Sequence, residues 1–193
     1  MKINSNILLK MLMWVAAIIV VPFVLLVVYE LTQLPRYTSE SLQKIHSQKL
    51  TMEDVDGKHL PPTPDPKLVD ATVQGIDANN NGIRDDVELA ISKKYPDDIK
   101  LRAAALQYAM TNQMFLTDVF NTETWKAVAE ESGRANLCVR DTGIGGKSGN
   151  ELTEEVRSLI FNTKGRVALR DKTFRYVTSY GSASGKACDV DIK

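Results

Sequence analysis

The chain has 193 residues and carries 24 basic and 24 acidic residues, so its formal charge is balanced. This balance argues against a nucleic-acid binder, which concentrates a surplus of Lys and Arg on one domain. About 160 residues follow an apolar N-terminal segment, enough for one domain with its own core, and no repeat of roughly 20 to 50 residues indicates a solenoid or propeller.

The first predicted element is a transmembrane helix over residues 11–30, preceded by a short cytoplasmic segment, 1–10. Residues 11–29 include no charged side chain. At about 1.5 Å per residue this run can cross a hydrocarbon core of roughly 30 Å. A cleaved signal peptide is the alternative, but the run lacks small residues at a cleavage position.

The orientation of this helix follows from the charges around it. Lys2 and Lys10 precede the span, whereas the charges after it are mixed. The positive-inside bias therefore favours a cytoplasmic N-terminus. We expect a signal anchor in the inner membrane of a bacterial-type envelope, with the C-terminal domain in the periplasm or outside the cell.

Residues 31–66 form the next predicted segment, a stalk that ends in a proline-rich stretch, 61–66. Prolines at this density favour extended polyproline II geometry. The segment has room for a short helix at 39–48. We place the folded domain after it, at 67–193.

Residues 77–88, with the sequence DANNNGIRDDVE, match the calcium-loop pattern D-x-[DN]-x-[DN]-G-x5-E at every required position. Calcium is a hard cation that takes six to eight oxygen ligands from a chain that curls around it, and Gly82 permits the sharp turn. The alternative is an Asn/Gly-rich turn before a helix, without metal. The predicted ligands are the side chains of Asp77, Asn79, Asn81, Asp85 and Glu88 and the backbone carbonyl of Ile83.

These residues resemble the calcium loops of EF-hand and thrombospondin type 3-like (DxDxDG) proteins of the bacterial envelope. The resemblance covers about a dozen residues and implies the same ligand positions. Two departures matter: Arg84 stands where an EF-hand has a hydrophobic residue, and residues 65–75 are too short for a full entering helix. The resemblance therefore implies a lone, half EF-hand-like loop that acts as a structural clamp and not as a sensor.

The remaining chain is predicted to be helical. A helix at 85–95 follows the loop, and a second at 97–119 is rich in good helix formers. A third begins at Thr122 or Thr124, and a fourth at Asn150, with Gly165 as a possible break. The expected fold is an all-α domain with one EF-hand-like calcium loop, joined to a transmembrane helix.

Cys138 and Cys188 are the two cysteines of the chain. In an exported domain the natural reading of an even count is a disulfide. A bridge over about fifty residues stabilises by roughly 4 kcal/mol on the chain-entropy model. Two separate buried thiols are the alternative.

Candidate catalytic groups are few. Both histidines, His46 and His59, precede residue 67, so the predicted domain has neither Ser-His nor Cys-His catalysis nor a His-based zinc site. Paired carboxylates at 97/98, 130/131 and 154/155 are assigned to solvated surfaces. The basic run from Lys164 to Arg175 is assigned to a solvated helix face, with an anionic surface such as lipid headgroups as the alternative.

These observations predict a membrane-anchored, exported calcium-binding protein that serves as a binding or interaction module. Its expected partners are calcium and one membrane, and no nucleic acid. Two alternatives stay open, an envelope hydrolase that uses a carboxylate pair and a purely structural helical domain without metal. Calcium titration distinguishes the calcium-binding protein from the structural domain without metal.

Overall fold

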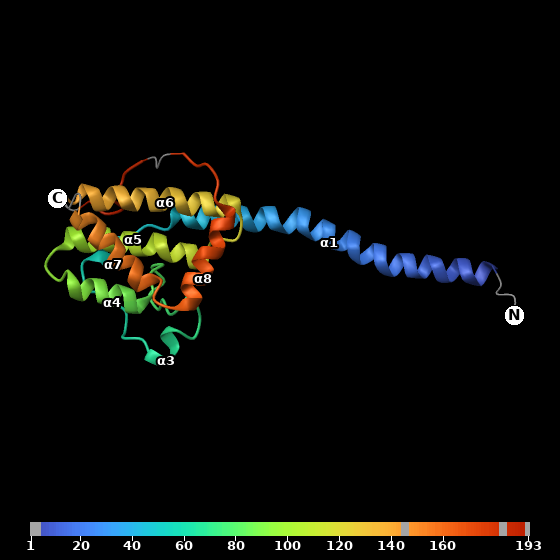
Figure 1. Cartoon of the computed structure of the whole chain (residues 1–193), viewed down its shortest axis with the longest axis horizontal. Helices are drawn as coiled ribbons and strands as arrows, with labels where there is room; N and C mark the ends of the chain where they lie inside the picture. Colours follow the sequence, from blue (N-terminus) through green and yellow to red (C-terminus); the bar gives the residue numbers. More distant parts are fainter. Residues whose placement is uncertain (1–4, 144–146, 182–184, 192–193) are drawn as a thin grey trace. The chain divides into compact units, whose positions relative to one another are not determined.

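The computed structural model describes residues 5–143, 147–181 and 185–191 of the chain (Figure 1). Over these residues the fold is all-helical and has no strand, which confirms the predicted class. The chain divides into two compact units, with the boundary between Glu40 and Ser41. Each unit is described by itself.

Helix α1 (Ser5–Ser47) contains the apolar segment. Its side chains between residues 13 and 37 are exposed, including Trp14, Phe23 and Leu31. It is the one helix among the described residues that is long and apolar enough to cross a membrane. The helix continues well past the predicted end of the span at residue 30, because residues 31–47 offer no break except Pro35.

The second unit contains the remaining helices. Their bounds are α2 (Met52–Val55), α3 (Pro66–Val69), α4 (Asp85–Lys94), α5 (Ile99–Thr117), α6 (Thr122–Asp141), α7 (Lys147–Ile160), α8 (Lys164–Thr173) and the 3-10 helix η1 (Phe174–Tyr176).

Helix α5 is the centre of this unit and contacts α2, α4, α6, α7 and α8. Its residues 102–114 are all buried, and small side chains such as Ala104, Ala105 and Ala109 let the neighbouring helices approach. A helix that is buried all round is typical of the core of an α-helical domain. It begins where the Asp98 side chain accepts a hydrogen bond from the Leu101 amide at 3.0 Å.

The break in the last predicted helix lies before Gly165 and not at it. Helix α7 ends at Ile160, and α8 begins at Lys164. The Thr163 side chain accepts from the Arg166 amide at 3.2 Å and so caps α8. Gly165 lies inside α8, because the capping hydroxyl decides where the helix starts.

The folded unit begins earlier in the chain than residue 67. Ile45 at the end of α1, Leu50 and Val55 are buried in the same core as α5. These three apolar side chains bind the segment to the domain, so much of the predicted stalk is part of the folded unit. The prolines that follow connect α2 to α3.

Cys138 and Cys188 form a disulfide, as predicted, with their Cα atoms 4.7 Å apart. Polar contacts hold the same C-terminal segment. The Gln107 side chain donates to the Ala187 carbonyl at 2.9 Å and accepts from the Asp189 amide at 2.9 Å. The disulfide therefore reinforces a segment that the core already binds.

Glu131 is the exception among the paired carboxylates, since it is buried and not on a solvated face. It accepts hydrogen bonds from Lys49 and from Arg134, the latter at 2.6 Å, and lies 3.2 Å from His46 Nδ1. His46 thus belongs to the folded unit. The sequence assignment was wrong here because these partners lie up to 85 residues away.

Candidate metal centre

The predicted calcium loop connects the segment after α3 to the start of α4. Two left-handed residues curl it, Asn80 with a φ of 57° and Gly82 with a φ of 85°. A β-carbon at position 82 would lie 1.7 Å from Gln48 Nε2. The positive φ of this residue therefore favours glycine, while the Gln48 side chain would have to move to admit a β-carbon.

Asp77 holds the loop closed at its first position. One carboxylate oxygen accepts from the Asn81 amide at 3.2 Å, and the other accepts from the Gly82 amide at 2.9 Å. Burial raises the pKa of this carboxyl although both hydrogen bonds act in the opposite direction. The side chain is thus a partly desolvated acid in an otherwise polar turn.

Glu88, on the first turn of α4, is 1% exposed. Its Oε2 accepts from the side-chain amides of Asn79 at 3.1 Å and Asn81 at 3.0 Å. Burial raises the pKa of Glu88 to about 7, against the effect of these two donors. The carboxyl is therefore buried with neutral donors that compensate only part of its desolvation.

Asp85 is also 1% exposed. Its Oδ1 accepts from the Ala78 amide at 3.0 Å, but its Oδ2 is buried and has no hydrogen-bond partner among the described residues. A buried acceptor without a donor costs about 1–3 kcal/mol. An unpaired carboxylate oxygen is the kind of group that a cation would satisfy.

The structure brings Asn79, Asn81 and Glu88 into direct contact, while the Asp77 and Asp85 carboxylates bind backbone amides of the same curl. The Ile83 side chain is fully buried in the core, as expected for a residue that offers only its carbonyl. No group of three or more His, Cys, Asp or Glu side chains within the described ranges is close enough to hold a metal.

The donor set nevertheless fits a hard cation. It consists of three carboxylates, two side-chain amides and one backbone carbonyl, and all of these can present oxygen. The amides of Asn79 and Asn81 direct nitrogen toward Glu88 in this structure. Rotation of each amide by 180° would present oxygen instead, and for Asn81 it would also break the hydrogen bond that Oδ1 accepts from the Ile83 amide at 2.9 Å.

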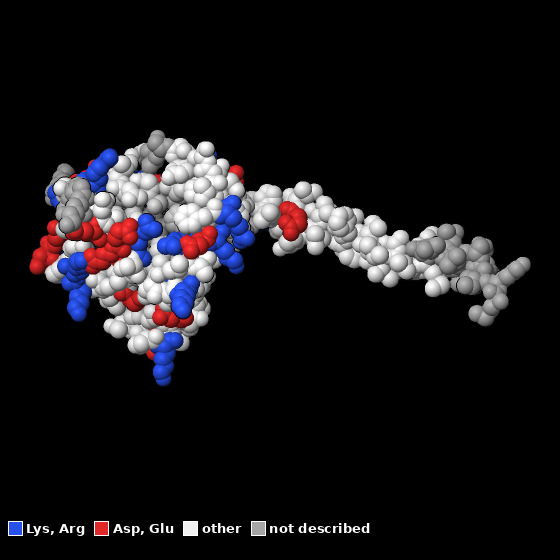
Figure 2. Space-filling model, in the orientation of Figure 1, with Lys and Arg blue, Asp and Glu red and all other residues white. Residues whose placement is uncertain are grey.

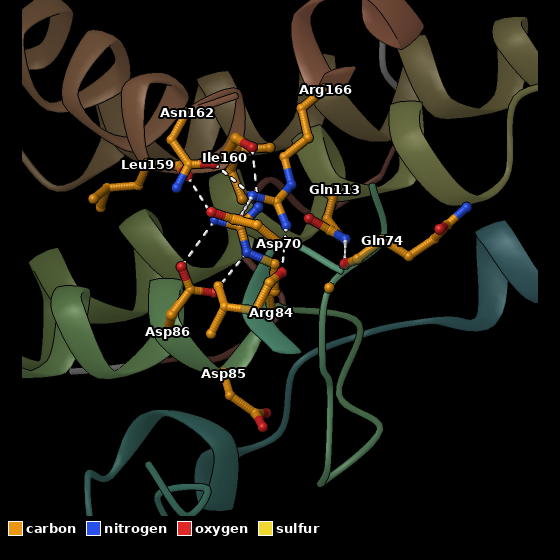
Figure 3. Close-up of polar contacts among 12 residues, drawn as sticks. Asp70, Gln74, Arg84, Asp85, Asp86, Gln113, Leu159, Ile160, Asn162 and Arg166 are labelled. Atoms are coloured by element: carbon orange, nitrogen blue, oxygen red, sulfur yellow. Dashed lines mark hydrogen bonds and ion pairs between the residues drawn. The ribbon is translucent and has the colours of Figure 1, made fainter. Parts of the chain in front are cut away.

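Arg84, at the eighth loop position, is fully buried, and its role was not predicted. Its guanidinium binds Asp86 through Nε at 2.6 Å and Nη2 at 2.9 Å. It also donates to the carbonyls of Leu159 at 2.8 Å and Ile160 at 3.1 Å (Figure 3). The loop is thereby attached to the C-terminal end of α7, where a cation is favourable. A hydrophobic residue could not make these contacts.

Arg166 on α8 is 1% exposed, so its assignment to a solvated face was wrong. It donates to the carbonyl oxygens of Val69 at 2.7 Å and Val73 at 3.0 Å and pairs with Asp70 (Figure 3). These contacts fix the chain that enters the loop. Nothing in the local sequence pattern distinguishes this arginine from its exposed neighbours.

A groove of about 890 Å³ runs along α4 beside the loop. Apolar side chains including Leu60, Val69 and Leu89 line it, together with Asp86, the partner of Arg84. The groove and the loop are therefore connected by helix α4 and by the ion pair between Arg84 and Asp86.

Searches of protein-family models, curated proteins and solved structures return no match to this chain.

Proposed function

We propose that this protein is anchored in a membrane by α1 and that its C-terminal unit binds one calcium ion in the loop 77–88. The ion stabilises the exported domain, which acts as a binding or interaction module. The predicted ligands are the six residues named from the sequence, with Glu88 supplying both carboxylate oxygens.

One observation carries this proposal: two buried acids, Asp85 and Glu88, lie in one curl, and no basic side chain pairs with either of them among the described residues. Asp85 has an unpaired oxygen, and the Glu88 carboxylate has only amide donors. A helix start or a tight turn needs neither buried carboxylate. A divalent cation would neutralise both and would supply the missing partner of Asp85.

The contacts of Arg84 favour a structural role for the ion over a switch. A sensor opens a pair of helices when calcium binds. Here the exit helix α4 is attached through Arg84 to the end of α7, and the entering segment is attached through Arg166 to α8. Closure of the loop around a calcium ion would therefore reinforce the attachments to α7 and α8 that already exist.

The anchor rests on the length and composition of α1 and on its exposed apolar side chains. Such side chains are favourable in lipid and unfavourable in water. The orientation that exports the C-terminal unit rests on Lys2 and Lys10 before the span. Retention of the full-length protein in alkaline-washed membranes tests the anchor, and protease access from either side tests the orientation.

Calorimetry on the full-length protein in detergent micelles tests the calcium site. We expect one site per chain and a higher melting temperature with calcium than with a chelator. Glu88→Gln keeps the shape of the side chain but removes its charge, and should abolish both responses. Glu154→Gln is the matched control, because it makes the same change on an exposed face of α7. A wild type without binding heat or a thermal shift would contradict the proposal.

A further inference from the structure

Helix α8 and the chain that follows it carry several basic side chains and several exposed large apolar ones. Residues 164–180 contain five basic residues and one acidic residue, Asp171. Arg166 is buried, as described above. We define the α8 face by the remaining basic residues and the exposed apolar ones, which are Lys164, Arg170, Lys172, Phe174, Arg175, Val177 and Tyr180.

The charge of the α8 face is strongly positive, although the chain as a whole is balanced. Four basic residues against Asp171 give it a net charge of +3. Arg170 pairs with its neighbour Asp171 at 2.7 Å, while Lys164 and Lys172 are exposed. In Figure 2 several basic side chains gather over the part of the unit where α8 lies.

The apolar members of the face are all exposed. Phe174 is 57% exposed, Val177 53% and Tyr180 48%. Tyr180 is held edge-on against Trp125 on α6, with ring centroids 5.6 Å apart. The exposed ring is therefore attached to a rigid helix, so the solvent-facing position of this segment is part of the fold.

Basic side chains beside exposed aromatic and aliphatic ones suit the boundary of an anionic bilayer. Lys and Arg are attracted to negatively charged headgroups, and tyrosine and phenylalanine insert at the level between headgroups and acyl chains. A nucleic acid would also satisfy the charges and could stack on Phe174 and Tyr180, but it would not account for the exposed aliphatic Val177, whereas the interface of a bilayer accommodates all three side chains.

We infer that the α8 face docks on anionic lipid headgroups of the membrane in which α1 is anchored. The inference rests on the proposed anchor, because a tether keeps the face at a high effective concentration near the lipid. Phe174, Val177 and Tyr180 enter the interface, and Lys164, Lys172 and Arg175 contact headgroup phosphates. The membrane thus contacts the protein at a second place besides its span.

Hydrogen exchange on the full-length protein in lipid nanodiscs tests this contact. One set of discs contains phosphatidylcholine alone, and the other contains equal parts of phosphatidylcholine and phosphatidylglycerol, at one fixed calcium concentration. Residues 178–181 lie outside the helices, and none of their amides has a backbone hydrogen bond among the described residues, so these amides exchange fast unless something covers them. We expect their exchange to slow at least about fivefold in the anionic discs, and high salt should reverse the effect.

A matched pair of variants separates the α8 face from general charge effects. Lys164→Glu/Lys172→Glu should remove the protection. Lys93→Glu/Lys100→Glu makes the same change in net charge near the connection between α4 and α5, which Figure 1 shows away from α8, and should retain it.

Equal exchange in both kinds of disc would overturn the inference, and so would protection that survives Lys164→Glu/Lys172→Glu. Protection in phosphatidylcholine that increases with protein concentration would overturn it in favour of self-association. The anchor is tested separately, by measuring whether the protein is retained in the discs after an alkaline wash. If the chain is not retained, flotation of the same full-length protein with added anionic vesicles tests the α8 face by itself, and failure to float would overturn the inference.

Discussion

The guanidinium of Arg84 donates a hydrogen bond to the carbonyl oxygen of Ile160 at 3.1 Å, in a fully buried contact between residues 76 positions apart. A candidate metal loop is thereby attached to the end of a helix from the other part of the domain. The carbonyl groups at a helix C-terminus lack intrahelical donors, and a buried cation is well suited to bind them.

Arg84→Met should therefore lower the free energy of unfolding by about 3 kcal/mol, because the carbonyls of Leu159 and Ile160 lose their donor and Asp86 loses its partner. Chemical denaturation of the full-length protein in micelles measures this change. Lys93→Met is a suitable control, since it removes an exposed cation from the same helix and should change stability by about 0.5 kcal/mol or less. Equal effects of the two substitutions would contradict the assigned role.

Calcium binding should depend on pH through Glu88, whose pKa of about 7 lies above its ordinary value of 4.5 because of burial. The metal-free folded protein then binds more protons than the unfolded chain between these two values, so its stability falls as pH rises through that window. Calcium needs the ionised carboxylate and must displace the proton. We expect the apparent affinity to fall by up to about tenfold per unit below pH 7.

Calorimetry in two buffers with different ionisation enthalpies measures this proton release. Release of nearly one proton is expected at about pH 6 and almost none at about pH 8. The same affinity at both pH values would exclude Glu88 as the coupled group.

Glu131 should have the opposite pH dependence. Burial raises its pKa, but hydrogen bonds from Lys49, Arg134 and His46 outweigh burial and hold the pKa below its ordinary value. Ionised Glu131 therefore stabilises the fold at pH values above its pKa in the unfolded chain. This stabilisation is lost as pH falls through the lower pKa that Glu131 has in the folded protein. Glu131→Gln should cost about 3 kcal/mol at pH 7.

Denaturation across the acid range is the measurement for this substitution. The difference between wild type and Glu131→Gln should shrink as pH falls below the ordinary glutamate pKa of 4.5 and through the lower pKa of the folded protein. Glu130→Gln, on the adjacent and less buried residue, should have little effect at any pH. A difference that does not change with pH would mean that packing, and not charge, explains the loss.

Loss of the disulfide should lower stability by about 4 kcal/mol, the chain-entropy contribution of a bridge across 50 residues. A reducing agent should lower the unfolding midpoint of the wild type by the corresponding amount. The double variant Cys138→Ala/Cys188→Ala should begin at the lower value and should not respond to the reductant. A wild type without response to complete reduction would show that Gln107 and Asp189 hold the segment unaided.

The sequence predicted the features that depend on neighbours along the chain. The all-helical class, the start of α4 at Asp85 and the pairing of Cys138 with Cys188 are confirmed. These features follow from helix propensity, from charge at a helix start and from the even number of cysteines. Calcium binding itself stays a prediction.

Burial of individual side chains by distant partners was not predicted, in contrast to the disulfide, which the count of two cysteines indicated. Ile45 lies in a polar segment and is buried only in the tertiary core, and Arg166 resembles an exposed base until the carbonyls of Val69 and Val73 surround it. Glu131 likewise follows a second carboxylate in a pattern that is typical of surfaces. Arg166 lies at least 93 residues from these carbonyl partners, and Glu131 lies 85 and 82 residues from His46 and Lys49, so no local pattern could indicate burial.

The attachment of Arg84 also has a consequence for protein engineering. An excised peptide of residues 77–88 would lack the α7 carbonyls that bind this side chain and the Gln48 amide that lies beside Gly82. Such a peptide would leave a guanidinium without its partners and would not keep the curl. A scaffold that receives the loop must therefore offer hydrogen-bond acceptors to Arg84 at the eighth loop position. Otherwise Arg84 must be replaced by a hydrophobic residue.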